Sequence, residues 1–173
     1  MATNKRTLQK QEPASIDVSA PETHYVVQCE DIRLISSALN PIINKKPAKS
    51  PGFAFRIKAI VEDKKSYSYL EVFVNQYITG LPSKLTGFEL SYVLMGTFVP
   101  SSEMSPVDLG NFVKQYTLTI LWPYAREYAT DVFRRTSTKD VVLPIINPQV
   151  VTEYIVENDL VEVEIIQKKK TKK

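Results

Sequence analysis

The sequence has few of the residues on which most catalytic and metal sites depend. Its 173 residues include one cysteine, Cys29, and one histidine, His24. One cysteine cannot form a disulfide within the chain, and one histidine cannot build a His-based zinc site or most catalytic triads. The five glycines form neither a GxGxxG nor a Walker A phosphate loop, and HExxH and CxxC are absent. We therefore expect no metal, no cofactor and no enzymatic activity.

Long apolar runs are missing as well. No stretch of eighteen apolar residues occurs, so no transmembrane helix is expected. Residues 1–15 are charged and are not followed by an apolar stretch, which is unlike a secretory signal. We expect a cytoplasmic protein that does not insert into membranes. Hydrophobic residues make up 43% of the chain, which excludes a disordered or low-complexity protein, and the length suits a single domain.

The positive charge is concentrated at the end of the chain. There are 22 basic and 19 acidic residues, and five of the lysines lie in 168–173, so the remainder has 17 basic against 19 acidic residues. A basic arm can contact nucleic acid or an anionic surface, but no aromatic or arginine-rich patch accompanies these lysines, so no nucleic-acid partner is expected. We predict a flexible arm over 1–22, one domain over 23–166 and a basic disordered tail over 167–173.

Apolar alternation predicts the strands. Four stretches are expected to form strands. Residues 24–39 are rich in β-branched residues, and apolar residues recur at every second position in 53–62, 67–78 and 88–95. Short turns at 62–65 and 79–83 allow hairpins, which indicates an antiparallel sheet. Asn40 and Pro41 are expected to end the first strand. Residues 40–52 contain three prolines and a glycine and are expected to form a long loop.

The second half of the chain is typical of helices. A short helix is expected over 106–116, and a longer one over 120–135 with Thr119 as its N-cap and Pro123 near its first turn. A final helix should begin after Asn147, because proline follows it. Residues 160–166 alternate like a short strand. Strands followed by helices predict an α+β domain with the helices on one face of the sheet.

The longer helix has two apolar stripes. One contains Leu121, Ala125, Tyr128 and Val132, and the other contains Trp122, Ala129 and Phe133. Two stripes imply more than one packing partner. We therefore expect an oligomer interface at Leu121, Ala125, Tyr128, Ala129, Val132 and Phe133.

Residues 109–136 resemble the signature region of the bacterial protein-export chaperone SecB family. The matching residues are Leu109-Gly110 and Leu121-Trp122-Pro123-Tyr124-Ala125-Arg126-Glu127, followed by the apolar stretch VVLPIINP, and Glu30-Asp31-Ile32 is similar to the family's acidic start of the first strand. The resemblance implies a four-stranded antiparallel sheet with a long helix and a second C-terminal helix packed on one face. It also implies a homotetramer, a dimer of dimers, that holds unfolded polypeptides without ATP.

The resemblance further implies a client-binding groove between the two helices, the second strand and the loop before it. The matching positions are Ile42, Ile43, Phe53, Phe55, Trp122, Tyr154 and Ile155. Family members dock the translocase motor SecA through acidic residues on the sheet. Asp31 matches one of these positions and Glu89 lies next to another, whereas Ile35 and Ser91 are not acidic, which weakens the implied SecA site.

Two functions follow as hypotheses. The first is a chaperone for export precursors or for an antitoxin, since divergent SecB-like proteins serve toxin–antitoxin systems. The second is an adaptor or regulator that binds one defined protein through the sheet face. Suppressing the aggregation of unrelated unfolded proteins would separate the first hypothesis from the second.

Overall fold

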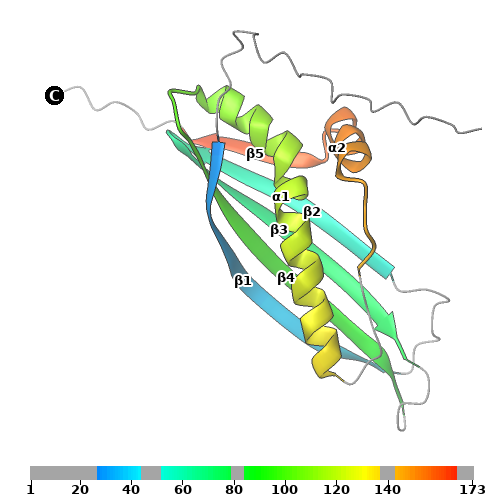
Figure 1. The fold of residues 1–173 in the computed structure, drawn as a ribbon. Coiled ribbons are helices and arrows are strands. Elements are labelled where there is room, and N and C mark those ends of the chain that lie inside the picture. Colours follow the sequence, from blue (N-terminus) through cyan, green and yellow to red (C-terminus); the bar gives the residue numbers. More distant parts are fainter. Residues whose placement is uncertain (1–26, 44–51, 79–83, 137–142, 167–173) are drawn as a thin grey trace, which may run out of the picture.

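Five strands and two helices form the part of the chain that the structure, a computed structural model, describes: residues 27–43, 52–78, 84–136 and 143–166 (Figure 1). The elements are β1 Val27–Ile43, β2 Gly52–Glu62, β3 Lys65–Tyr77, β4 Leu85–Pro100, α1 Pro106–Arg135, α2 Pro148–Glu157 and β5 Val161–Ile166. The predicted arm over 1–22 and the predicted tail over 167–173 lie outside the described residues.

The sheet has five strands in the order β1-β4-β3-β2-β5. Strands β1 to β4 pair antiparallel, but β5 runs parallel to β2, from Ile57 opposite Val161 to Glu62 opposite Ile166. The predicted four-stranded antiparallel sheet is therefore wrong in strand number and in being purely antiparallel. The α+β class is confirmed, and the short strand expected near 160–166 is the added fifth strand. Helix α2 returns the chain to the sheet beside β2, which places β5 at that edge.

Strand β1 continues further than the sequence predicted. Asn40 and Pro41 do not end it, because pairing with β4 continues to Ile43, opposite Leu85. Proline lacks the backbone N–H that a ladder needs, but an edge strand has one side without partners, where that loss costs nothing. The loop expected over 40–52 is therefore wrong for 40–43 and for Gly52, which belong to strands. The rest of it, 44–51, lies outside the described residues.

One continuous helix replaces the two expected over 106–116 and 120–135. The N-cap is Ser105, whose Oγ accepts a hydrogen bond from the backbone N–H of Asp108 at 3.1 Å, and Thr119 lies inside the helix. Pro123 is also internal and faces solvent. Thr117 and Leu118 are buried, so packing on the sheet carries the helix through the region predicted as a break. For α2 the expected start is confirmed, because Val151 N–H donates to the Asn147 carbonyl at 3.2 Å.

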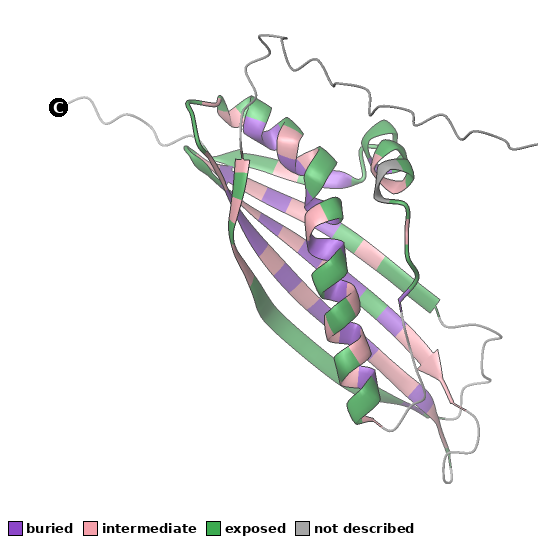
Figure 2. Cartoon of the chain, viewed as in Figure 1, coloured by how far each residue is buried: buried purple, intermediate pink, exposed green. Residues whose placement is uncertain are grey.

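The core lies between α1 and the inner face of the sheet. Buried residues alternate along β2, β3 and β4, whereas most of β1 is exposed (Figure 2). Gly96 on β4 allows α1 to approach closely, because a Cβ atom there would lie 3.0 Å from Leu121 Cδ2 and 3.0 Å from Phe98 Cε2. Helix α1 therefore covers one face of the sheet, and α2 lies beside it toward β2 (Figure 1).

Candidate functional site

An aromatic cluster joins the start of β2 to α1. The rings of Phe53 and Phe55 each lie 5.9 Å from the ring of Trp122, measured between centroids. Trp122 is 3% exposed, whereas Phe53 is 41% exposed and Phe55 is half-buried. The structure thus brings together three of the predicted groove residues. The Trp122 ring is buried beneath them, and the Phe53 ring is exposed to solvent.

The segment before α2 forms a second wall of this region. Trp122 Nε1 donates to the Pro144 carbonyl at 3.3 Å, and Arg126 Nε donates to the Leu143 carbonyl at 3.0 Å. These bonds hold residues 143–147 beside α1, near the start of β2 (Figure 1). Ile145 points away from the core and is 85% exposed. Sequence reasoning missed this wall, although the apolar stretch with an internal proline was visible.

Helix α2 packs against β2 and forms a third wall of this region. A cavity of about 120 Å³ lies between the strand and the helix, and it is lined by Phe55, Arg56, Ile57, Val151, Tyr154, Ile155 and Leu160. Ile155 is buried in the core, while Tyr154 is 60% exposed. Both predicted α2 residues therefore line the cavity, but only Tyr154 offers substantial free surface.

The two isoleucines at the end of β1 are in different surroundings. Ile42 is buried, whereas Ile43 is 54% exposed. The Ile42 carbonyl accepts a hydrogen bond from Thr86 Oγ1 at 3.0 Å, which fixes the strand end to β4. Neither residue lines the cavity beside α2. Only Ile43 has the exposure that contact with a client requires.

The residues expected at an oligomer interface mostly face their own sheet. Leu121, Ala125, Ala129 and Phe133 are completely buried within the subunit, so they have no surface left for a neighbouring one. Tyr128 and Val132 are half-buried against the same core. Tyr92 donates to the Ala125 carbonyl at 2.7 Å, and burial raises the pKa of its phenol. Packing against the subunit's own core therefore explains why α1 has two apolar stripes.

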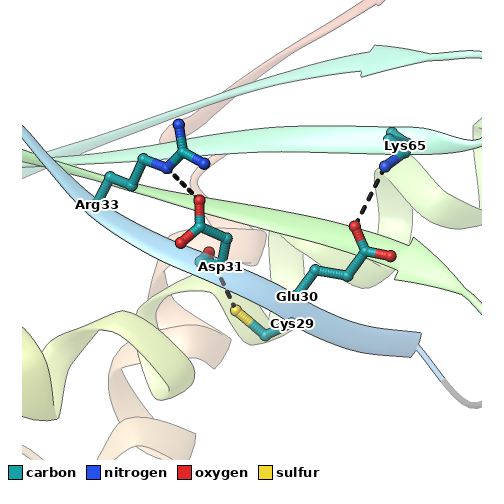
Figure 3. A network of polar contacts seen from close by, with 5 residues as sticks. All are labelled: Cys29, Glu30, Asp31, Arg33 and Lys65. Carbon is teal, nitrogen blue, oxygen red and sulfur yellow. Dashed lines mark hydrogen bonds and ion pairs between the residues drawn. The ribbon is translucent and has the colours of Figure 1, made fainter.

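The two predicted docking acids lie far apart on the outer face of the sheet. Asp31 is opposite Thr97 in β4, eight residues from Glu89 along that strand, which corresponds to about 26 Å. Asp31 forms an ion pair with Arg33, and Glu30 pairs with Lys65 at 3.2 Å (Figure 3). Asp31 and Glu89 are therefore not part of one compact site.

Metal-binding and nucleophilic side chains were sought among the described residues. They contain no group of three or more side chains able to hold a metal ion. Cys29 Sγ lies 3.7 Å from the Asp31 carbonyl, and burial raises the pKa of its thiol, which disfavours the nucleophilic thiolate. Among the described helices, none is long and apolar enough to cross a membrane.

Comparison with known proteins gives matches among solved structures only. No family model matches the chain, and no curated protein matches it in sequence. A SecB-like chaperone from Mycobacterium tuberculosis, solved in complex with a ChAD peptide from the HigA1 antitoxin, aligns with a TM-score of 0.54. The alignment covers 70% of this chain and 91% of the chaperone, at 18% sequence identity. The fold is SecB-like. The resemblance noted in the sequence is thus confirmed for the fold.

Proposed function

We propose that this protein is an ATP-independent holdase that binds unfolded polypeptides in the cytoplasm. The proposed site, here called the client groove, consists of the start of β2, Trp122 of α1, residues 143–147 and the side of α2 that carries Tyr154. The observation that supports it best is Phe53, a large apolar side chain that remains 41% exposed while its ring contacts a buried tryptophan. Such a surface suits apolar segments of many sequences and needs no chemical step.

Simple energetics favour several grooves acting together. Burying one client aromatic, about 150–250 Å², yields about 4–6 kcal/mol before ordering costs. Ordering the client costs about 1–2 kcal/mol for each fixed residue, so a single groove binds weakly. Several grooves on one assembly that engage the same chain raise the avidity. We therefore keep the homotetramer as part of the proposal.

The described surface offers two regions for such an assembly. The outer side of α1 exposes Tyr116 and Tyr124, at 45% and 49%. Edge strand β1 exposes Leu34, Ile35 and Leu39, and none of the described strands pairs with its free side. These residues replace the buried stripe of α1 as the proposed contacts between subunits.

The polypeptides that we propose as clients are an antitoxin or an export precursor. The neighbouring chaperone was solved with an antitoxin peptide, which supports the first. Asp31 and Glu89 lie about 26 Å apart along the sheet, which argues against one compact acidic site for docking SecA.

A second candidate function is an adaptor that binds one defined partner through the outer sheet face. Phe73 is 37% exposed and lies between the buried Val72 and Val74 of β3, so its side chain is on the outer face. Both described helices lie on the other side of the sheet (Figure 1). An adaptor would bind its partner tightly and would leave unrelated unfolded proteins to aggregate.

The test is aggregation suppression with a chemically unfolded client, using wild type, Phe53→Asp and Val107→Asp. Val107 is 58% exposed at the start of α1, away from the client groove, and serves as the control. We expect suppression by wild type and Val107→Asp and a large loss for Phe53→Asp. Suppression by none of the three, with intact thermal melts, would refute the holdase proposal.

A further inference from the structure

The outer face of the sheet is apolar and aromatic along its middle strands. On β3, Tyr67, Tyr69 and Phe73 alternate with residues that are completely buried on the inner face. Their side chains therefore point to the side of the sheet that has no described helix (Figure 1). The solvent-facing side of an antiparallel sheet is normally polar. This one has aromatic side chains that are half-buried or exposed, with no described element above them.

Strand pairing joins these aromatic residues to apolar ones on the neighbouring strands. Tyr69 lies opposite Met95 of β4, and Tyr67 lies opposite Ile60 of β2. The resulting surface, here called the outer stripe, consists of Ile60, Tyr67, Tyr69, Val93 and Met95. Ion-paired side chains of β1 and β5 border it on its two sides. An apolar patch with a polar rim is typical of an interaction surface.

The chain that precedes β1 joins the sheet close to the outer stripe. Strand β1 begins at Val27, opposite Pro100 of β4. Thr97 pairs with Tyr67 and lies three residues from Pro100, so Val27 is about 10 Å along the strands from the level of Tyr67. Twenty-six residues precede Val27, and an extended chain spans about 3.3 Å per residue. This segment is therefore long enough to cross all five strands, which together span about 20 Å.

The sequence of residues 1–26 is complementary to this face. Ile16 and Val18 alternate with serine and aspartate over 15–19, which is the pattern of an extended stretch with one apolar side. Val18 is nine residues before Val27, a reach of about 30 Å, so both apolar side chains can arrive at the outer stripe. The first ten residues contain three basic side chains and no acidic one, whereas the border on β5 carries two glutamates.

We propose that residues 1–26 pack across the outer face of the sheet, with Ile16 and Val18 against the outer stripe and the basic first ten residues toward β5. Because the segment belongs to the same chain, its effective concentration at the stripe is about millimolar, so weak contacts suffice. The inference does not depend on the client groove, which lies on the helix side of the sheet. It makes the N-terminal segment a cover that any partner docking on the outer face has to displace.

Hydroxyl-radical footprinting of the full-length protein tests the inference, because it oxidises accessible tyrosine and methionine side chains and is measured for each residue by mass spectrometry. Tyr69 and Met95 report on the outer stripe. Replacing both apolar residues, Ile16→Asp with Val18→Asp, should release the cover. We expect the oxidation rates of Tyr69 and Met95 to rise at least about threefold, since a face that is free for a third of the time or less reacts in proportion.

A matched control adds the same charge on the other side of the alternating stretch. Ser15→Asp with Ser19→Asp should leave the oxidation of the outer stripe unchanged, because the serine side chains point away from the sheet when the apolar ones face it. Tyr154, which is 60% exposed on α2, lies on the helix side of the sheet. Its oxidation rate should be the same in wild type and in both variants.

Unchanged oxidation of Tyr69 and Met95 in the apolar variant would overturn the inference, as would an equal rise in the serine control. Protection that increases with protein concentration would also overturn it, because the cover would then be a second copy. A rise that includes Tyr154 indicates general unfolding, and Ile16→Ser with Val18→Ser then decides without added charge. A rise confined to Tyr69 and Met95 in that variant supports the inference, and no rise overturns it.

Discussion

The two parts of β2 have the same alternating sequence and opposite environments. In the part paired with β5, Ile57, Ala59 and Val61 are at most 2% exposed, whereas Phe53, on the same face, is 41% exposed. Both parts pair fully with β3. On its other side β5 pairs with the first part, here called the closed part, and not with the second, here called the open part. Ala59 and Val61 of the closed part also pack against Leu109 and Val113 of α1. One strand thus contributes to the core along part of its length and keeps apolar surface accessible along the rest.

The largest expected effect is in the closed part. Ile57→Ala should lower the free energy of unfolding by about 2–5 kcal/mol, because it leaves a cavity in the core. Denaturant unfolding measures this. Ile60→Ala, half-buried on the same strand, is the control and should cost less than about 1.5 kcal/mol. Similar losses for the two variants would show that the closed part is not specially buried.

The end of β1 extends the comparison to neighbouring isoleucines. Ile42→Ala should cost about 2–3 kcal/mol, because Ile42 is 4% exposed, and Ile43→Ala less than about 1 kcal/mol, because Ile43 is 54% exposed. Thermal melts of the two variants test the difference. If Ile43 contacts clients, Ile43→Asp should weaken aggregation suppression without changing the melt, and unchanged suppression would show that clients do not contact Ile43.

In the open part, function should change more than stability. Phe53→Ala should cost about 1 kcal/mol in stability and weaken client binding about tenfold. Phe73→Ala is a matched control, since Phe73 is 37% exposed on the outer face of the sheet. Anisotropy titration with a labelled unfolded client compares the two variants. An equal loss of affinity for both would mean that clients contact both faces.

The smallest effect should appear where β5 attaches. Lys58→Ala removes ion pairs to Glu162 at 3.1 Å and Glu164 at 3.9 Å. These side chains are substantially exposed, so the loss should stay below about 1 kcal/mol. Hydrogen exchange over Val161–Ile166 should become faster while the core amides of β3 do not change. A change of several kcal/mol would indicate that the ion pairs, rather than the burial of Val161, hold β5 in place.

The sequence was sufficient where local pattern decides structure. Alternation placed β2, β3 and β4, and Asn147 followed by Pro148 placed the start of α2. It failed where tertiary context decides. Pro41 signals the end of a strand unless the strand lies at an edge, and Pro123 signals a helix start unless packing of Leu118 and Leu121 holds the helix together. Neither condition is visible in the neighbouring residues.

The sequence identified aromatic residues of the candidate site but not the strand pairing around them. Phe53, Phe55 and Trp122 do meet, as the resemblance implied. The open edge of β2 was not predictable, because the parallel partner of a strand cannot be identified from its own sequence. Sequence alone could not show that four of the six residues expected at an interface on α1 are buried within the subunit, because a helix that lies along a sheet can bury two adjacent stripes on a single surface.

The pairing of β2 with β5 also has a consequence for synthesis of the protein. Lys58 and its ion-pair partner Glu162 are 104 residues apart, and both helices lie between them. At about 5–20 residues per second, a ribosome needs about 5–20 s to make that stretch. During this interval the whole edge of β2 lacks its parallel neighbour. A nascent chain that has completed β2, β3 and β4 therefore exposes a longer unpaired edge than the finished protein does, and closure of that edge is a late step of folding on the ribosome.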